Sequence, residues 1–254
     1  MEKKSKIALV TGGSRGLGRD MALRLAEKGA DVILTYNSKE QDALDVVAQI
    51  KQGSRQATAL QLNVGAIKSF DLFIDQLKNV LNKEFGSTHV DFLINNAGIG
   101  GYAAVSDVTE EMFDELLNIH FKGVYFLTQK VLPLLNDGGG IVNVSSGLTR
   151  ISVPGSSAYA SMKGAIEIFT RYLAKELGSK GIRANTVAPG AVLTDFGGAH
   201  LRNNQQLQDF VSSVTALGRP GEPEDIGGVV AFLCSEDARW VNGQRIEVSG
   251  GMQL

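Results

Sequence analysis

Short runs rich in β-branched residues alternate with longer amphipathic segments along the whole chain. The short runs are typical of buried strands, and the longer segments have the length and apolar spacing of helices that cover a sheet. The expected strands are residues 7–11, 32–36, 57–62, 91–94, 141–145, 183–188 and 245–248. The expected helices are residues 17–28, 40–52, 67–85, 109–135, 157–177 and 222–235.

This alternation predicts one doubly wound α/β domain over residues 1–254, with a parallel sheet of about seven strands and helices on both faces. Right-handed crossovers would bring the loops that follow the strands to one edge of the sheet, where we expect a ligand. Residues 194–217 interrupt the alternation, with Gly197, Gly198 and a polar run at 202–208. We interpret this segment as a lid over the substrate.

The composition excludes several classes of protein. Hydrophobic residues make up 43% of the 254 residues and charged residues 20%, as in ordinary globular proteins. A formal charge of −2 predicts no basic surface, so we expect a small-molecule ligand and neither nucleic acid nor membrane as a partner. The apolar stretches at 7–10 and 229–234 are too short for a signal peptide or a membrane helix, which predicts a cytoplasmic protein.

A glycine-rich turn, Thr11-Gly-Gly-Ser-Arg-Gly-Leu-Gly18, joins the first expected strand to the first helix. Glycines let the backbone approach a pyrophosphate, and a helix N-terminus offers free N–H groups to it. A purely structural tight turn is the alternative, but the place between strand and helix favours a dinucleotide. The residues expected to line this part of the site are Gly12, Ser14, Arg15, Gly16, Leu17 and Gly18.

The end of the second expected strand indicates which dinucleotide is used. This stretch, Tyr36-Asn37-Ser38-Lys39, lacks the acidic residue that would bind a ribose 2′-hydroxyl and repel a 2′-phosphate. Arg15 could bind that phosphate with help from Ser38 or Lys39, so NADP(H) is favoured and NAD(H) stays possible. Alternatively, both cations are solvated and Glu40 binds a 2′-hydroxyl.

Three residues have a spacing that suits proton transfer. Ser146 ends the fifth expected strand, Tyr159 follows thirteen residues later, and Lys163 lies four residues further on the same face of a helix. A phenol needs a nearby cation to ionise near neutral pH, and Lys163 could supply it. Tyr159 would then exchange a proton with a substrate oxygen that Ser146 binds. The alternative is that Tyr159 and Lys163 lie on the surface and have no catalytic role.

Together these motifs resemble those of the short-chain dehydrogenase/reductase family over nearly the whole chain. The resemblance implies a Rossmann fold, a nicotinamide cofactor, catalysis by Ser146, Tyr159 and Lys163, and commonly a homotetramer. It also implies that Asn63 and Val64 lie near the adenine and that the loop from Pro189 to Thr194 holds the nicotinamide amide. The further residues that the resemblance assigns to the cofactor are Asn95, Ala97, Gly98, Pro189, Gly190, Val192 and Thr194.

One residue departs from the family pattern. Many members carry a catalytic Asn in the fourth helix, and the matching position here is His120. That Asn is thought to hold a water in a proton relay, which His120 could replace through its backbone or its imidazole. A structural and a catalytic role for His120 both stay open, and we expect no metal site at His89 or His200.

The main hypothesis is an NADP(H)-dependent oxidoreductase that interconverts a carbonyl and an alcohol, with Tyr159 as general acid and base. One alternative is a reductase of 3-oxoacyl groups on acyl carrier protein. The uncharged or acidic run at 136–139 disfavours it, because such enzymes tend to present basic residues there. Another alternative is a dinucleotide sensor without turnover, which would not need Ser146, Tyr159 and Lys163.

Overall fold

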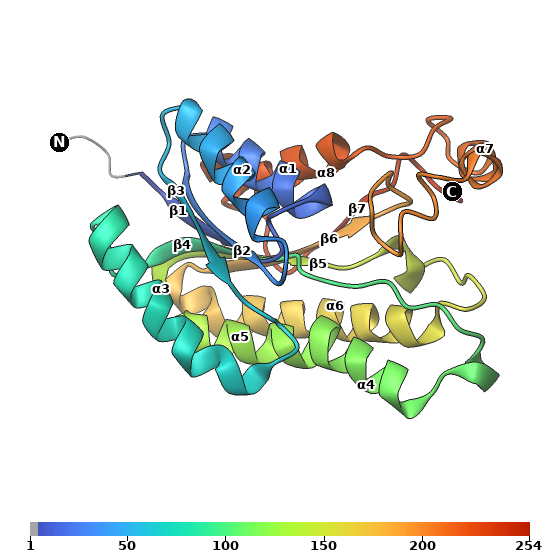
Figure 1. Cartoon of the computed structure of the whole chain (residues 1–254), viewed down its shortest axis with the longest axis horizontal. Helices are drawn as coiled ribbons and strands as arrows, with labels where there is room; N and C mark the ends of the chain where they lie inside the picture. The colour runs from blue at the N-terminus through green and yellow to red at the C-terminus, as the bar shows by residue number, and fades with distance from the viewer. Residues whose placement is uncertain (1–4) are drawn as a thin grey trace.

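The structure is a computed structural model that describes residues 5–254. Seven parallel strands form one sheet in the order β3-β2-β1-β4-β5-β6-β7, with every neighbouring pair parallel (Figure 1). The strands are β1 Ile7–Val10, β2 Asp31–Tyr36, β3 Ala57–Gln61, β4 Val90–Asn95, β5 Leu135–Val144, β6 Arg183–Pro189 and β7 Arg245–Val248. The predicted doubly wound fold is confirmed.

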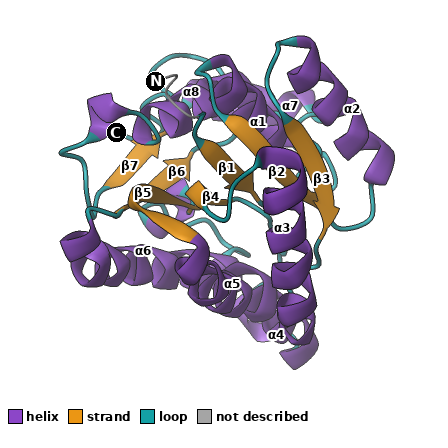
Figure 2. Ribbon diagram, turned by 90° about the vertical axis from the view of Figure 1, so that its left-hand side faces the viewer, coloured by secondary structure: helices purple, strands orange, loops and turns teal. Residues whose placement is uncertain are grey.

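Helices cover both faces of this sheet. Helices α1, α2 and α8 lie on one face, and α3, α5 and α6 lie on the other, with α4 beyond them (Figures 1 and 2). The helices are α1 Gly16–Glu27, α2 Glu40–Gln52, α3 Phe70–Phe85, α4 Glu110–Leu117, α5 Gly123–Val131, α6 Ser157–Leu177, α7 Gln205–Ser213 and α8 Pro223–Leu233. No helix in the described part of the chain is both long and apolar enough to cross a membrane.

The strands supply apolar residues to both layers because successive side chains point to opposite faces of the sheet. In β1, Ala8 and Val10 pack with α1, α2 and α8, whereas Ile7 and Leu9 pack with α3 and α5. All four side chains are almost completely buried. Burial on both faces explains why the central strand β1 is a continuous apolar run.

The prediction of a single helix over 109–135 is wrong. It divides into α4, a π-helical turn at Asn118–Lys122, α5, and a 3-10 turn at Leu132–Leu134. Gly123 follows the π turn, and a Cβ built on it would lie 2.1 Å from the carbonyl oxygen of Val64. The chain approaches a neighbouring backbone there more closely than a side chain would allow, and the widened turn accompanies this approach.

The segment 194–217 contains a helix that the sequence did not indicate. Helix α7 begins after Asn204, whose side chain accepts a hydrogen bond from the Leu207 amide at 3.1 Å. The polar run at 202–208 hid its start. Residues 214–217 then pair with the C-terminal residues 250–253 through three backbone hydrogen bonds, Gln253 N to Val214 O among them, so the base of the segment is fixed.

Candidate active site

The loops that carry the predicted site meet at the carboxyl ends of the parallel strands. Residues 11–15 follow β1, 96–104 follow β4, 145–156 follow β5 and 190–204 follow β6. The strand order reverses direction between β1 and β4, and such a switch point opens a crevice between the loops. This edge is therefore where the fold can bind a dinucleotide.

The glycine loop has the backbone shape of a phosphate cradle. Gly12 and Gly16 have φ values of +65° and +54°, in the left-handed region that favours glycine. A Cβ on Gly18 would lie 2.2 Å from the carbonyl oxygen of Gly12, so a larger residue would displace the loop. Helix α1 begins at Gly16, which leaves its first N–H groups free for an anion.

Two residues of the sequence motifs that were not assigned to the site, Thr11 and Asn96, tie this loop to β4. The Thr11 hydroxyl oxygen accepts hydrogen bonds from the amides of Asn96 and Ala97, at 2.9 and 3.0 Å. The Asn96 side-chain amide donates to the carbonyl oxygens of Thr11 and Gly12, at 2.9 and 3.2 Å. Asn96 thus fixes the distance between the phosphate loop and the loop after β4.

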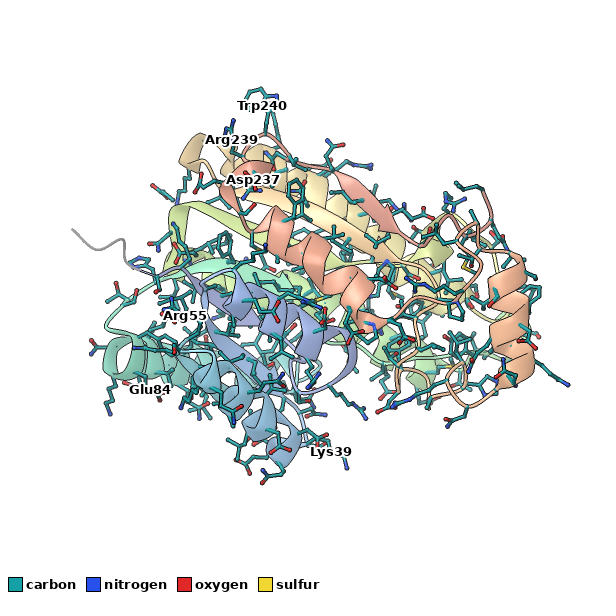
Figure 3. All side chains as sticks on the ribbon, turned by 90° about the horizontal axis from the view of Figure 1, so that it is seen from above. Lys39, Arg55, Glu84, Asp237, Arg239 and Trp240 are labelled. Carbon is teal, nitrogen blue, oxygen red and sulfur yellow. The ribbon has the colours of Figure 1, made fainter. Side chains whose placement is uncertain are left out.

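The expected adenosine end of the site is open and polar. Asn37, Ser38 and Lys39 are exposed, and the Lys39 side chain points away from the body of the protein (Figure 3). Tyr36 donates its hydroxyl to a Glu40 carboxylate oxygen at 2.9 Å, so Glu40 already has a partner. Arg15 is also exposed and forms no ion pair within residues 5–254.

On the other side of this end, the predicted adenine contact Asn63 is exposed, and Val64 beside it is half-buried. The Asn63 carbonyl Oδ1 accepts a hydrogen bond from the Gly65 amide at 2.9 Å, which fixes the turn after β3. Its side-chain amide nitrogen stays available to a ligand.

Asn95 has a structural place rather than the predicted contact with a cofactor. Its side chain is 4% exposed, and its amide donates to Thr128 Oγ1 at 3.0 Å and to Asn143 Oδ1 at 2.8 Å. Asn143 in turn donates to Thr170 Oγ1 at 2.9 Å. This buried chain joins β4, α5, β5 and α6 and holds the strand ends in register.

Ser146, Tyr159 and Lys163 come together at the end of β5. Helix α6 turns Tyr159 and Lys163 inward, where they are 8% and 5% exposed. The Lys163 ammonium lies 5.6 Å from the centre of the Tyr159 ring and donates to the Val144 carbonyl oxygen at 2.8 Å. Because Val144 is two residues before Ser146, this bond fixes the helix against the loop that carries the serine.

Burial shifts the pKa values of this group. It raises the pKa of Tyr159, with a smaller contribution from Tyr102, whereas the hydrogen bond with Ser146 lowers it. Burial also lowers the pKa of Lys163 to about 7. In the protein without ligands, Tyr159 is therefore protonated at neutral pH and Lys163 is charged in only part of the molecules.

His120 lies directly against the tyrosine. It is completely buried in the π turn, and its ring meets the Tyr159 ring edge-on with centroids 5.0 Å apart. Its Nε2 lies 2.8 Å from the Ile99 carbonyl oxygen and 3.3 Å from the Ile99 amide nitrogen, and we assign the proton to Nε2 from the shorter contact. Nδ1 is then an acceptor, and it has no partner in the described residues. Burial and the charge of Lys163 lower the pKa of His120 to about 3, so the imidazole is neutral.

Gly98 and the loop after β6 complete the crevice. A Cβ on Gly98 would lie 2.6 Å from His120 Cε1, so only glycine fits beside this histidine. The Gly190 amide, next to Pro189, donates to the Val248 carbonyl oxygen at 3.0 Å, and Val192 pairs with the backbone of residue 221. Thr194 faces the glycine loop, since its methyl group is 3.6 Å from a Cβ built on residue 16.

Two aromatic side chains lie near Tyr159. Phe196, in the segment predicted as a lid, lies with its ring centroid 5.9 Å from that of Tyr159 and is 41% exposed. Tyr102, in the loop after β4, is 60% exposed. A Cβ on Gly197 would lie 3.2 Å from Tyr102 Cε2, so the two loops touch. The sequence analysis placed the segment 194–217 over the substrate without identifying Phe196.

Fold and crevice together define an oxidoreductase scaffold of the dinucleotide-binding class, and comparison with known proteins agrees. A family model described as enoyl-(acyl carrier protein) reductase matches residues 12–253. A short-chain dehydrogenase/reductase of Aspergillus novofumigatus is 36% identical, covering 97% of this chain and 95% of the relative. A hydroxynaphthalene reductase-like protein of Metarhizium brunneum is also 36% identical, covering 97% and 94%.

Among solved structures, the angucycline C-6 ketoreductase LanV with bound NADP is 38% identical and superposes with a TM-score of 0.93, covering 98% of this chain and 95% of LanV. A second LanV structure contains NADP and rabelomycin. The chain belongs to the short-chain dehydrogenase/reductase family of oxidoreductases.

Proposed function

We propose that this protein is an NADP(H)-dependent carbonyl reductase in which Tyr159 is the general acid. The observation that carries the proposal is the meeting of Tyr159, Lys163 and Ser146 at the edge of the sheet where the glycine loop also ends. A dinucleotide sensor without turnover would not need a buried lysine held against a buried tyrosine.

Bound NADPH supplies the hydride that reduces the carbonyl carbon. The Ser146 hydroxyl donates a hydrogen bond to the carbonyl oxygen and stabilises the charge that develops there. Tyr159, protonated at neutral pH, gives its proton to the same oxygen, and the charged form of Lys163 stabilises the phenolate that remains. The raised pKa of Tyr159 suits reduction more than oxidation, because the resting residue is a donor.

His120 acts in this proposal as a neutral group that holds the tyrosine ring. Its edge-on contact with Tyr159 and its bond to Ile99 fix the ring, while the unpartnered Nδ1 offers an acceptor for a water on the way to Lys163. Because burial and Lys163 lower the pKa of His120 to about 3, its imidazole is neutral at neutral pH, and we assign the proton transfer to Tyr159 and not to His120.

We assign the 2′-phosphate of NADP(H) to Arg15, with Ser38 and Lys39 beside it. The cradle at Gly12 to Gly18 fits a pyrophosphate, and the Glu40 carboxylate is bound by the Tyr36 hydroxyl. Within residues 5–254, Arg15 and Lys39 form no ion pair. LanV, which shares this fold at 38% identity, binds NADP. The segment 194–217 then serves as the lid over the nicotinamide end.

The substrate that fits best is a flat ketone with fused rings. Tyr102 and Phe196 expose aromatic faces beside the proton donor, and aromatic partners add about 0.5–1.5 kcal/mol beyond burial alone. Two of the relatives are named for compounds of this shape, a hydroxynaphthalene and an angucycline. We expect 2-tetralone to be reduced with a higher kcat/KM than cyclohexanone, which has one ring.

The proposal is tested by comparing wild type with Tyr159→Phe, which removes only the hydroxyl. NADPH binding is measured by fluorescence titration, and 2-tetralone reduction by the loss of NADPH absorbance. We expect unchanged NADPH binding and a turnover reduced at least a hundredfold. Unchanged turnover in this variant contradicts the mechanism.

The matched family model is named for reduction of an enoyl group on acyl carrier protein, so that reaction belongs in the same assay. An enoyl and a 3-oxoacyl thioester are therefore compared with 2-tetralone. If either thioester is reduced faster than 2-tetralone, that thioester and not the ketone is the substrate. The assignment of NADP(H) as the cofactor is unaffected by this result.

We also propose a homotetramer. A tetramer with twofold symmetry needs two different self-complementary faces. Tyr125, Ile168 and Tyr172 expose apolar groups on α5 and α6, and Phe232 and Trp240 do so on the α8 side, where Trp240 points away from the body (Figure 3). Light scattering should give four copies for wild type and two for Tyr172→Glu or Trp240→Glu, whereas a monomeric wild type contradicts the proposal.

A further inference from the structure

Four charged side chains form a line of ion pairs behind the loop that carries Ser146. Glu167 and Arg245 join through Oε1 and Nε at 2.8 Å, Arg245 and Glu247 through Nη1 and Oε2 at 3.0 Å, and Arg150 reaches Glu247 Oε1 at 2.6 Å. Glu167, Arg245 and Glu247 are at most one-quarter exposed. Two acids alternate with two bases, so the line carries no net charge.

Glu167 continues the catalytic face of α6. It follows Lys163 at the same four-residue spacing that separates Lys163 from Tyr159. Its Oε1 accepts hydrogen bonds from the hydroxyls of Ser145 and Thr149, both at 2.7 Å. The carboxylate therefore holds both ends of the turn that contains the catalytic serine.

Arg245 approaches the same turn from β7. Its Nη2 donates to the carbonyl oxygen of Ser146 at 3.3 Å and to the Thr149 hydroxyl at 3.1 Å. The Thr149 hydroxyl is also 2.9 Å from the Ser146 carbonyl oxygen. The Ser146 backbone is thus held through its carbonyl oxygen, while its hydroxyl oxygen accepts a hydrogen bond from the Leu148 amide at 3.2 Å and its side chain bonds with Tyr159.

The guanidinium of Arg245 is itself held in place. Glu247 binds it and also accepts two hydrogen bonds from Arg150, which continues to the carbonyl oxygens of Met252 and Gln253 at 2.7 and 3.1 Å. Arg150 thereby forms the end of this line. The bonds from Arg150 lower the pKa of Glu247 to about 2, so Glu247 stays ionised at neutral pH.

We propose that Glu167 and Arg245 are positioning residues, which set the place of the Ser146 hydroxyl relative to Tyr159 without touching the substrate themselves. Only the effect of this pair on catalysis rests on the proposed function. The anchoring of the turn by the pair is a separate property that can be measured without a substrate.

Three variants test the anchoring. Arg245→Met and Glu167→Gln break the pair. Arg55→Met is the control, because Arg55, like Arg245, donates to a hydroxyl and to backbone carbonyl oxygens, at a different part of the fold (Figure 3). Hydrogen exchange of the amides in 148–151, which bond within the turn, is expected to accelerate at least fivefold in the first two variants only. Unchanged exchange in both variants overturns the proposal.

A double-mutant cycle tests the catalytic consequence. Arg245→Met should lower kcat for 2-tetralone at least tenfold, change NADPH affinity by less than twofold, and have almost no further effect when Ser146 is already alanine. An equal loss in both backgrounds shows that Arg245 does not act through Ser146 and overturns the proposal. Arg245→Lys, which keeps a cation, should recover part of kcat.

If Arg245→Met does not fold, Thr149→Val removes a single hydroxyl from the same contacts and is judged by the same two measurements. Absence of ketone reduction by wild type refutes the proposed function alone, since the exchange result still decides whether the pair anchors the turn.

Discussion

Replacing Lys163 with methionine is expected to make the stability difference from wild type depend on pH in the ligand-free protein. Lys163 is 5% exposed, and burial lowers its pKa from 10.5 to about 7. Below pH 7 the amine is protonated in the folded and unfolded states, so the fold bears the whole penalty of a buried charge. Between pH 7 and 10.5 the folded state releases the proton while the unfolded chain keeps it, so the folded state gains stability as pH rises.

The size of this effect follows from the pH interval. From pH 6 to pH 9, two units lie above the folded-state pKa, and each unit corresponds to 1.36 kcal/mol, so wild type should gain roughly 2–3 kcal/mol relative to the methionine variant. The free energy of unfolding of the variant, which has no charge at position 163, should be highest relative to that of wild type at pH 6.

The assay is urea unfolding of both proteins at pH 6 and pH 9. Comparing the two proteins at each pH removes the titration of every group that they share. Lys175→Met, at an exposed position of the same helix, is the control and should show no such change. The reasoning is refuted if the difference in unfolding free energy between wild type and Lys163→Met is the same at pH 6 and pH 9 within about 0.5 kcal/mol. Burial would then not disfavour the charged form of Lys163.

Three further results are expected. Arg15→Ala should weaken NADPH binding roughly ten- to a hundredfold and leave NADH binding almost unchanged in parallel titrations, since it removes a charged hydrogen bond of ~1.5–3 kcal/mol. Gly98→Ala should lower the free energy of unfolding by ~1–3 kcal/mol through its contact with His120, and by less when His120 is alanine, as urea unfolding of the four proteins would show. Phe196→Ala should raise KM for 2-tetralone and leave the Kd of NADPH unchanged in steady-state and binding assays.

The parts of the fold that depend on local periodicity were predictable from the sequence. Each of the seven strands overlaps the apolar run that predicted it, and α2 and α6 have the predicted bounds. The meeting of Tyr159 and Lys163 also follows from local spacing, because a helix turns residues four apart to one side. Strand β5 starts at Leu135, six residues before the predicted start at 141, since the polar and glycine residues at 136–140 hide its first part.

What could not be predicted depends on contacts between distant parts of the chain. Glu167 and Arg245 are separated by 78 positions, and no spacing rule connects a helix residue to an edge strand. The division of the helix over 109–135 depends on the approach of Gly123 to Val64, which is likewise a contact between separate elements.

Asn95 and Asn96 show where closer reading of the sequence would have succeeded. Side chains alternate along a strand, and in β4 Leu93 packs toward α3 and α5, whereas Ile94 packs toward α1 and α8. Asn95 has the phase of Leu93 and therefore points into the helix layer, where it meets Thr128. Asn96 has the phase of Ile94 and points to the glycine loop. Two identical neighbouring residues thus have different roles, and the strand alternation alone distinguishes the structural one from the one beside the cofactor site.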